Sequence, residues 1–368
     1  MDGGCIGKID LQFLMNSNIS NDEITRVAEQ FSNSIKHIST LPGGLIHQTY
    51  RVLQTDGRSL VLQSINAHVF QKPAAVISNY LTLYQHLQAR GFTIPQPIPS
   101  TNEDWLVLDR KGKYWRALQY MEHSFTKSIA TQHLAREAAK CFASFVYQLR
   151  DLDTHLIQET IPHFHNLDYR YQQFTNALHR ATPERILMAN EWIQFIEKKQ
   201  SIIEFFQYIK SEPAFRKRIM HHDCKTANIL FHQQTEEVIC PVDLDTTMPG
   251  YFFSDVGDII RSMVPTQSEE SINWKGINIE PGFYGAIIDG YLNGFQNQLT
   301  DLEIKHIHSA GILMIFMQGL RFLTDFLNHD IYYRVDYPNQ NLDKARNQFL
   351  VLEALSNFLA RQHNYSIG

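Results

Sequence analysis

The side chains with the clearest chemical pattern lie in the stretch IMHHDCKTANILFH, residues 219–232. An apolar run leads into His-Asp, and four residues later Asn228 precedes a second apolar run. The carboxylate of Asp223 and the carboxamide of Asn228 therefore lie on what we expect to be a loop between two apolar segments. Such a pair predicts a site for something small and charged.

Two further carboxylates, Asp243 and Asp245, end the next β-rich stretch, in PVDLDTTMPG. A strand that ends in Asp, soon after the loop with Asp223 and Asn228, brings oxygen-bearing side chains together. Magnesium prefers hard oxygen ligands, few of them from protein, with phosphate and water completing its shell. Asn228 and Asp243 suit that role, which leaves Asp223 free to orient or deprotonate a substrate hydroxyl.

Protein kinases divide the work in this way. A catalytic-loop Asp takes the hydroxyl proton, while an Asn and a later Asp hold the metal. The chemistry then depends on positioning and charge neutralisation. The structural alternative is a turn-rich hairpin whose Asp and Asn side chains only cap backbone groups. The downstream carboxylates and the β-rich region upstream favour the catalytic interpretation.

Zinc is a rival metal for the same stretch, with four possible ligands: His221, His222, Cys224 and His232. No HxxxH or CxxC spacing supports such a site. Adjacent residues on an extended segment also point to opposite faces. We therefore expect Cys224 and Cys240 to be packed thiols.

Composition places these residues in an ordinary globular protein. The chain has 368 residues, 43% hydrophobic and 19% charged, with a net charge of −5, enough for one large or two moderate domains. No block of Lys or Arg indicates nucleic acid or an anionic membrane as a partner. Four cysteines without a CxxC pair, and a start that lacks signal-peptide features, predict a reducing, cytoplasmic setting. The apolar stretch 310–323 is shorter than the roughly 20 residues of a membrane span, so we expect a buried helix.

The first 120 residues predict a hairpin-rich sheet with one helix. Asp56-Gly57 between two apolar runs is a strong hairpin signal. Residues 73–91 have helical periodicity, with Pro73 near the start and Gly91 just past the end. The expected strands are 36–41, 48–55, 59–65 and two within 104–121.

From about residue 130 the pattern becomes helical, with one β-rich exception at 216–245. Two short strands there, 227–231 and 238–245, flank a polar turn. The helix-like stretches are 134–152, 190–210, 283–299 and 342–360. The sequence therefore predicts a small β-rich lobe and a large helical lobe, with one hairpin carrying the reactive stretch into the helical lobe.

A glycine pair, Gly43 and Gly44, lies in LPGGLIHQTYRV between two strands. A dinucleotide-binding turn opens a helix, so that interpretation fails. A glycine-rich hairpin folded over phosphates fits better, because glycine lets the backbone approach closely. A plain hairpin turn remains the alternative.

These motifs together resemble the aminoglycoside phosphotransferase/choline kinase-like superfamily and, within it, most closely the N-acetylhexosamine 1-kinases. The resemblance runs from about residue 36 to 355. It rests on HHDCKTANILF, PVDLDTTMPG with SDVGDIIR, IPHFHNLDYRYQQF, YWRALQYMEHS, LVLQSIN and LRFLTDFLNHDIYYRVDYPNQNL. HxDxxxxN marks the superfamily alone, whereas VDLDTTMPG…DVGDIIR and RFLTDFL…DIYY are far more specific.

The resemblance implies an α+β, bilobal, protein-kinase-like fold, with a nucleotide-binding lobe at 1–122 and a helical lobe at 123–368. It implies an enzyme that phosphorylates the anomeric hydroxyl of an N-acetylhexosamine with ATP and Mg²⁺. By match, Asp223 is the catalytic base, and Asn228 and Asp243, assisted by Asp245, hold the metal. The segment that meets the adenine is Gln119, Tyr120, Met121 and Glu122, and the residues that hold the sugar are Arg321 and Tyr332.

Two positions depart from relatives. Gln63 stands where many relatives carry a strand lysine that grips ATP phosphates, although the hexosamine kinases share the LQ pair. The phosphate charge must then be met by magnesium or another cation. Leu45 stands where these kinases have a sugar-contacting His, and His47 follows two residues later as the candidate. An apolar residue cannot bond a sugar hydroxyl.

Several of these residues also have purely structural interpretations. Arg321 would pair with Asp325 one turn on, and Tyr332 would be a packed aromatic. We favour a structural role for Asp255 and Asp258, bracing the loop that carries the metal ligand. His163 and His165 are expected either to line the sugar pocket or to be core or surface histidines.

Two other functions remain open at this point. One is a kinase of a different small hydroxylated acceptor, such as an aminoglycoside or choline, which a strongly acidic pocket would favour. The other is a nucleotide-binding pseudokinase scaffold, which Gln63 leaves open and which intact Asp223, Asn228 and Asp243 argue against. No sequence feature indicates the oligomeric state.

Overall fold

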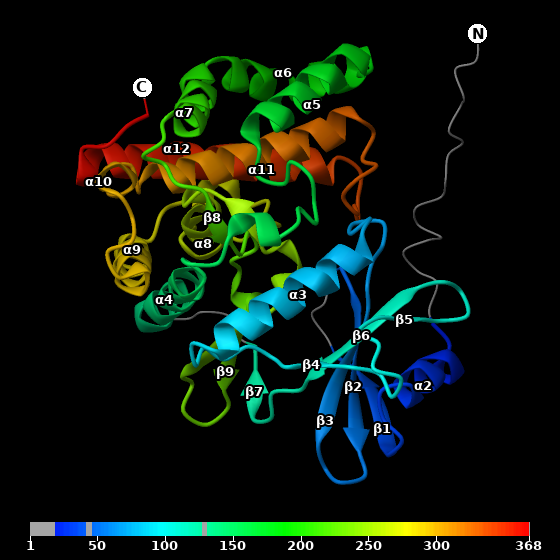
Figure 1. The fold of residues 1–368 in the computed structure, drawn as a ribbon. Coiled ribbons are helices and arrows are strands. Elements are labelled where there is room, and N and C mark those ends of the chain that lie inside the picture. The colour runs from blue at the N-terminus through cyan, green and yellow to red at the C-terminus, as the bar shows by residue number, and fades with distance from the viewer. Residues whose placement is uncertain (1–18, 42–45, 127–130, 368) are drawn as a thin grey trace.

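The computed structural model describes residues 19–41, 46–126 and 131–367 (Figure 1). The chain forms an antiparallel sheet with two helices, followed by a larger helical part that holds two short β-ribbons. The elements of the first part are α2 (Asn21–Glu29), β1 (Ile35–Thr40), β2 (Gln48–Gln54), β3 (Ser59–Ser64), α3 (Pro73–Gln88), β4 (Pro97–Ile98), β5 (Val107–Leu108) and β6 (Tyr114–Gln119). The α+β, two-lobed expectation is confirmed.

The strands of the first part lie in the order β1-β2-β3-β6-β4, with β5 beside β6. The strands expected at 36–41, 48–55 and 59–65 are confirmed as β1, β2 and β3, to within a residue or two. The hairpin between β2 and β3 turns at Gly57, whose φ of 89° favours glycine. Asp56 supports the turn by accepting the backbone N–H of Arg58 at 3.0 Å.

The two faces of this sheet meet different partners because side chains alternate along a strand. Trp115 and Ala117 of β6 pack with Leu60 and Leu62 of β3 beneath α2. Helix α2 begins at a Ser20 cap and lies outside the sequence prediction. The opposite face carries the intervening residues of β3 and β6, and it is turned away from α2.

Helix α3 ties the sheet to the helical part (Figure 1). Pro73 opens the helix, as the sequence predicts, since its missing N–H needs no partner in the first turn. Leu83 and Leu87 are fully buried in the same apolar core as the helices that follow. Helix α3 and Leu118 of β6 therefore belong to the core of the helical part, whereas the sheet residues under α2 form a separate cluster.

The helical part contains two ribbons, β10-β9-β7 and β11-β8, among its helices. Its elements are β7 (Ser124–Phe125), α4 (Gln132–Gln148), α5 (Leu167–Arg180), α6 (Pro183–Glu197), α7 (Gln200–Ser211), β8 (Arg218–Met220), β9 (Ile229–His232), β10 (Val238–Pro241), β11 (Met248–Gly250), α8 (Phe253–Met263), α9 (Pro281–Phe295), α10 (Asp301–Lys305), α11 (Ser309–Leu327) and α12 (Gln340–His363).

One expected helix is wrong in detail. The helical stretch at 190–210 is two helices, because α6 ends at Glu197 and α7 begins at Gln200. The intervening EKKQ segment offers no apolar side chain to a core, so a break there costs little. Both helices contact α11, but α6 also contacts α12, whereas α7 also contacts α5.

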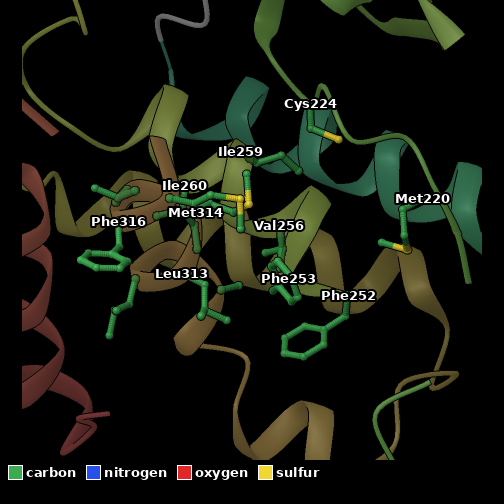
Figure 2. Packing of buried hydrophobic residues seen from close by; sticks show 14 of the residues in the cluster. Met220, Cys224, Phe252, Phe253, Val256, Ile259, Ile260, Leu313, Met314 and Phe316 are labelled. Atoms are coloured by element: carbon green, nitrogen blue, oxygen red, sulfur yellow. The ribbon is translucent and has the colours of Figure 1, made fainter. Parts of the chain in front are cut away.

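Helices α8 and α11 cross at the centre of the helical part (Figure 2). Val256, Ile259 and Ile260 of α8 pack with Leu313 and Met314 of α11 in one buried cluster. Helix α11 is long and apolar enough to cross a membrane, yet 89% of the tested window is buried inside the protein. The predicted buried helix is confirmed.

The crossing of α8 and α11 depends on Gly257. A Cβ atom at this position would lie 2.3 Å from the backbone oxygen of Ala310, and a backbone atom cannot rotate away. Gly257→Ala should therefore push the helices apart and lower the free energy of unfolding by about 1–3 kcal/mol. Calorimetric or denaturant unfolding of the purified protein measures this.

Gly285 of α9 is the matched control, because a Cβ there would meet nothing within 4 Å. Gly285→Ala should leave stability unchanged or raise it by up to about 1 kcal/mol through helix propensity. Equal effects of the two substitutions would contradict the close crossing.

Candidate active site

The loop between β8 and β9 carries Asp223 and Asn228 side by side. The Nδ2 atom of Asn228 donates to the Oδ2 atom of Asp223 at 2.8 Å and to its backbone oxygen at 2.9 Å. Lys225 places Nζ 2.8 Å from the same Oδ2. Both donors act on one oxygen, so among the described residues the Oδ1 atom of Asp223 has no hydrogen-bond partner. The Asp223 side chain is 19% exposed, so this oxygen can be reached.

The charge on Lys225 is set by its neighbours. Burial lowers the pKa of Lys225, but the carboxylates of Asp223 and then Asp243 outweigh burial and raise this pKa above its usual range. The ammonium group therefore stays charged beside Asp223.

Two carboxylates of α8 accept hydrogen bonds from the backbone of this loop. Asp255 accepts the backbone N–H groups of His221 at 3.0 Å and His222 at 2.8 Å. Asp258 accepts the backbone N–H of Cys224 at 2.8 Å. Asp255 and Asp258 thus brace the loop that carries Asp223 and Asn228, in keeping with the structural role that the sequence predicts for them.

His221 joins the Asp223 loop to the Asp243 loop. Its Nε2 atom lies 3.0 Å from the backbone oxygen of Val242, and its backbone oxygen accepts the Thr246 hydroxyl at 2.7 Å. The backbone N–H of Val242 also donates to the Asn228 backbone oxygen at 2.9 Å. These bonds bring the two predicted acidic stretches to one place.

The strand predicted at 238–245 ends at Pro241, and Asp243 lies just beyond it with φ 60° and ψ 54°, a left-handed conformation. Burial, together with the negative charges of Asp245 and Asp223, raises the pKa of Asp243 to about 6. Because Asn228 uses its Nδ2 on Asp223, its Oδ1 faces away from that carboxylate. A carboxylate crowded by others, on a loop bonded to the loop that carries Asn228, fits a divalent cation.

Asp245 has two side-chain partners from the first part of the chain. Arg116 of β6 donates to its two carboxylate oxygens at 2.6 and 2.9 Å, and His47 Nε2 lies 2.8 Å from Oδ2. Burial raises the pKa of Asp245, but Arg116 and His47 outweigh burial and lower it. His47, Asp243 and Asp245 are also the one group among the described residues whose ligand atoms lie within 4.8 Å of one another. Metal binding by Asp245 stays a prediction.

The predicted contact of His47 with the acceptor also stays a prediction. The Nδ1 atom of His47 accepts the backbone N–H of Asn66 at 3.1 Å, and its Nε2 is bonded to Asp245. The ring stacks on Phe70. A substrate contact would have to replace one of these bonds. Gly43, Gly44 and Leu45 lie outside the described residues.

The segment predicted to meet the adenine, 119–122, links β6 of the large sheet to β7, which pairs with β9. Arg51 lies over the Tyr120 ring at 4.2 Å and 3.2 Å from Glu122. The Met121 oxygen accepts the Ser124 hydroxyl at 2.5 Å. The adenine contact and the boundary at residue 122 stay predictions.

Arg321 lies among aromatic rings at the other side of the Asp223 loop. Its guanidinium is 5.4 Å from the centre of the Phe164 ring, 5.6 Å from that of Tyr333 and 6.0 Å from that of Tyr332. The alternative pairing of Arg321 with Asp325 is wrong. Asp325 instead accepts backbone N–H groups of residues 331–333. This carboxylate therefore shapes the turn that carries both tyrosines.

A cavity of about 120 Å³ lies beside Phe164. His163, His165 and His222 contribute to its lining, together with Tyr251 at the start of α8. The Nδ1 atom of His165 is buried without a hydrogen-bond partner among the described residues. The two histidines of the IPHFHN motif thus line a cavity next to the residue that precedes Asp223.

The zinc alternative finds no support in the described residues. His221 and His222 bond backbone oxygens, and neither belongs to a group that could hold a metal. Cys224 and Cys240 are buried free thiols, as predicted. Burial raises the pKa of Cys240 to about 12 and that of Cys224 well above its usual range.

Sequence reasoning missed three residues of this site. Lys225 was detectable as a cation two positions after Asp223. Arg116 was detectable as a charged residue between two inward apolar residues of a strand. Arg170, whose guanidinium donates to the Phe164 oxygen at 3.1 Å, had no local signal.

Comparison with known proteins places the chain in a family. Residues 37–297 match the sequence model of the phosphotransferase enzyme family, APH. The chain belongs to this family. It is an ATP-dependent kinase that acts on small hydroxylated substrates, and the expected superfamily is confirmed.

Solved structures of kinases share the fold. An amicoumacin kinase in complex with AMP-PNP and Ca²⁺ has a TM-score of 0.62 and 12% identity, over 93% of this chain and 96% of that one. An aminoglycoside phosphotransferase from Alicyclobacillus acidocaldarius has 0.58 and 13%, over 94% and 96%. The Plasmodium vivax ethanolamine kinase has 0.59 and 12%, over 94% of each chain. At these identities the likeness concerns the fold alone.

The pKa of Asp243 makes stability depend on pH when no divalent cation is present. Its folded-state pKa is raised from 3.8 to about 6, so the folded protein holds this proton more tightly than the unfolded chain does. The stability that this proton contributes is present at low pH and is lost as the pH rises through about 6. Without magnesium, Asp243→Asn should raise Tm by roughly 2–4 °C at about pH 7.5 and change little at about pH 4, close to the unfolded-state pKa of 3.8.

Thermal unfolding in EDTA at both pH values measures this effect. Asp289→Asn, on the surface of α9, is the control; it loses an exposed ion pair with Arg136, which contributes little, so it should not raise Tm at either pH. Added Mg²⁺ should narrow the difference by stabilising the wild type. A lower Tm for Asp243→Asn at the higher pH in EDTA would refute the electrostatic account.

Proposed function

We propose that the protein transfers the γ-phosphoryl group of ATP to the anomeric hydroxyl of an N-acetylhexosamine or a similar sugar. The observation that carries this proposal is the arrangement at Asp223. Asn228 and Lys225 both bond Oδ2, so Oδ1 is free to accept the proton of a hydroxyl. A base held in place by two bonds needs no rearrangement during the reaction.

Magnesium would be held by Asp243 and Asn228, on the two loops that meet beside Asp223. The ion, when bound, would neutralise phosphate charge. The ammonium group of Lys225 pairs with Asp223 and counters its negative charge. The linker at 119–122, between the two sheets, is where we place the adenine. The use of ATP and the free thiols among the described cysteines support a cytoplasmic setting.

The side chains beyond Asp223 favour a neutral sugar over a cationic acceptor. Arg321 and Arg170 both contact Phe164, and neither lies within ion-pair distance of a carboxylate among the described residues. Burial and then the nearby Arg321 lower the pKa of Arg170 to about 10. An aminoglycoside or choline would be repelled here. A sugar offers hydroxyl and carbonyl oxygens to guanidinium donors and an apolar face to aromatic rings.

Turnover across a panel of acceptors tests this function. ATP consumption should be fastest with N-acetylglucosamine or N-acetylgalactosamine, and phosphorus NMR should show a sugar 1-phosphate. Fast turnover with choline, ethanolamine or an aminoglycoside, but not with sugars, would refute the proposed sugar acceptor and identify the acceptor class instead. Nucleotide binding without turnover on any acceptor would indicate a scaffold instead.

The role of Asp223 has its own test. Asp223→Asn removes the base while the amide keeps the shape, so kcat should fall by about 10²–10⁴-fold. Asp289→Asn, far along the surface of α9, should leave kcat unchanged. Undiminished turnover in Asp223→Asn would refute the proposed base.

Arg321 should act on acceptor binding alone. Arg321→Gln should raise the acceptor KM by about 10-fold or more, through loss of a charged hydrogen bond, and leave the KM for ATP unchanged. Arg334→Gln, an exposed residue paired with Asp336, is the matched control. An equal rise in the KM for ATP would place Arg321 outside the acceptor site.

A further inference from the structure

A row of polar side chains crosses the face of the sheet that is turned away from α2. Thr49 of β2 is directly opposite Gln63 of β3, and Gln63 is directly opposite Arg116 of β6. Residues paired in this way point to the same face. This face is turned away from α2, which covers the alternate residues. The row therefore points toward α3 and the loop with Asp243.

The bonds along this row have a fixed direction. A guanidinium can only donate, so Gln63 must turn its Oε1 toward the Nε atom of Arg116, at 3.0 Å. The Nε2 atom of Gln63 then faces the other way, where it lies 3.3 Å from the Thr49 hydroxyl. Its second hydrogen has no acceptor among the described residues. Gln63 thus presents a donor, rather than an acceptor, along the row.

The far end of the row is anchored on the loop with Asp243. Arg116 grips both carboxylate oxygens of Asp245, and the Asp245 backbone oxygen accepts the Thr160 hydroxyl at 2.6 Å. Asp245 lies in the short turn Leu244–Thr246 that directly follows Asp243. The position of Asp243 is therefore set by a side chain of the sheet.

Charge explains why this position is occupied by arginine. Arg116 is 1% exposed, and a buried charge is tolerated only when it is paired and hydrogen-bonded. In protein kinases, a lysine of the third strand pairs with a helix Glu. Here helix α3 places the ring of Tyr80 5.6 Å from the Arg116 guanidinium. Asp245 supplies the counter-charge instead.

We propose that Arg116 is the positioning residue of the nucleotide site. It holds Asp245 so that Asp243 keeps its place, and it turns the Gln63 amide so that Nε2 donates to a phosphate oxygen. The inference rests on the proposed use of ATP and is independent of the acceptor. It has one unusual consequence: a lysine at position 63 would harm nucleotide binding, since its ammonium would face the Arg116 guanidinium.

Four variants of the full chain test this, with Mg²⁺ and AMP-PNP binding measured by calorimetry. Gln63→Lys should weaken binding about tenfold or more, and Arg116→Met should do the same. The double variant Gln63→Lys/Arg116→Met should bind better than the product of the single effects predicts, because the introduced ammonium can then pair with Asp245. Gln85→Lys adds the same charge on the exposed face of α3 and should bind like the wild type.

Unfolding midpoints separate positioning from a general loss of structure. If Arg116→Met does not fold, Arg116→Lys keeps the charge but loses the two-pronged grip, and it should weaken AMP-PNP binding with a smaller loss of Tm. Gln63→Lys that binds as tightly as the wild type, or tighter, would overturn the inference. So would strictly independent effects in the double variant.

The outcome is distinguishable from failure of the proposed function. AMP-PNP binding with the expected variant pattern, but without turnover of any acceptor, would defeat the proposed function and support the role of Arg116. A wild type that does not bind AMP-PNP would defeat both.

Discussion

The buried contact of Asp245 with Arg116 and His47 is the interaction on which the site depends. Asp245 belongs to the helical part, whereas Arg116 and His47 belong to the sheet. Neither the Asp245 carboxylate nor the Arg116 guanidinium would be stable here alone, because burying a charge without a partner costs several kcal/mol. The two parts of the chain therefore meet in one arrangement, and that arrangement puts the end of β10 beside the Asp223 loop.

The charges around this contact are unevenly distributed. Asp223, Asp243 and Asp245 crowd together, and the pKa of Asp243 is raised by burial and by its two neighbours. Such crowding is costly without a cation, and it is what a metal-binding site with a strongly charged phosphate substrate requires. The guanidinium groups of Arg321 and Arg170 both contact Phe164, and neither has a carboxylate partner among the described residues. One half of the site thus has carboxylates suited to a cation, and the other half has guanidinium groups suited to neutral or negatively charged oxygen atoms.

The same loop is held by backbone contacts as well as by charges. Asp255 and Asp258 accept N–H groups of the Asp223 loop from α8, and α8 is fixed by its close crossing with α11 at Gly257. A chain of packing therefore runs from the central helices to the Asp223 loop.

The sequence by itself determined the periodic elements and the acidic motifs. Strands β1 to β3, helix α3, the buried helix α11 and the Asp223, Asn228 and Asp243 set follow from spacing within short windows. Only the tertiary structure decided their partners. Arg116 and Asp245 are separated by 129 positions and His47 and Asp245 by 198, so no local pattern could pair them. The break between α6 and α7 was also invisible, because it depends on which neighbours each helix packs against. Contacts between distant side chains depend on how the whole chain folds, and that is why the network around Asp245 appears only in three dimensions.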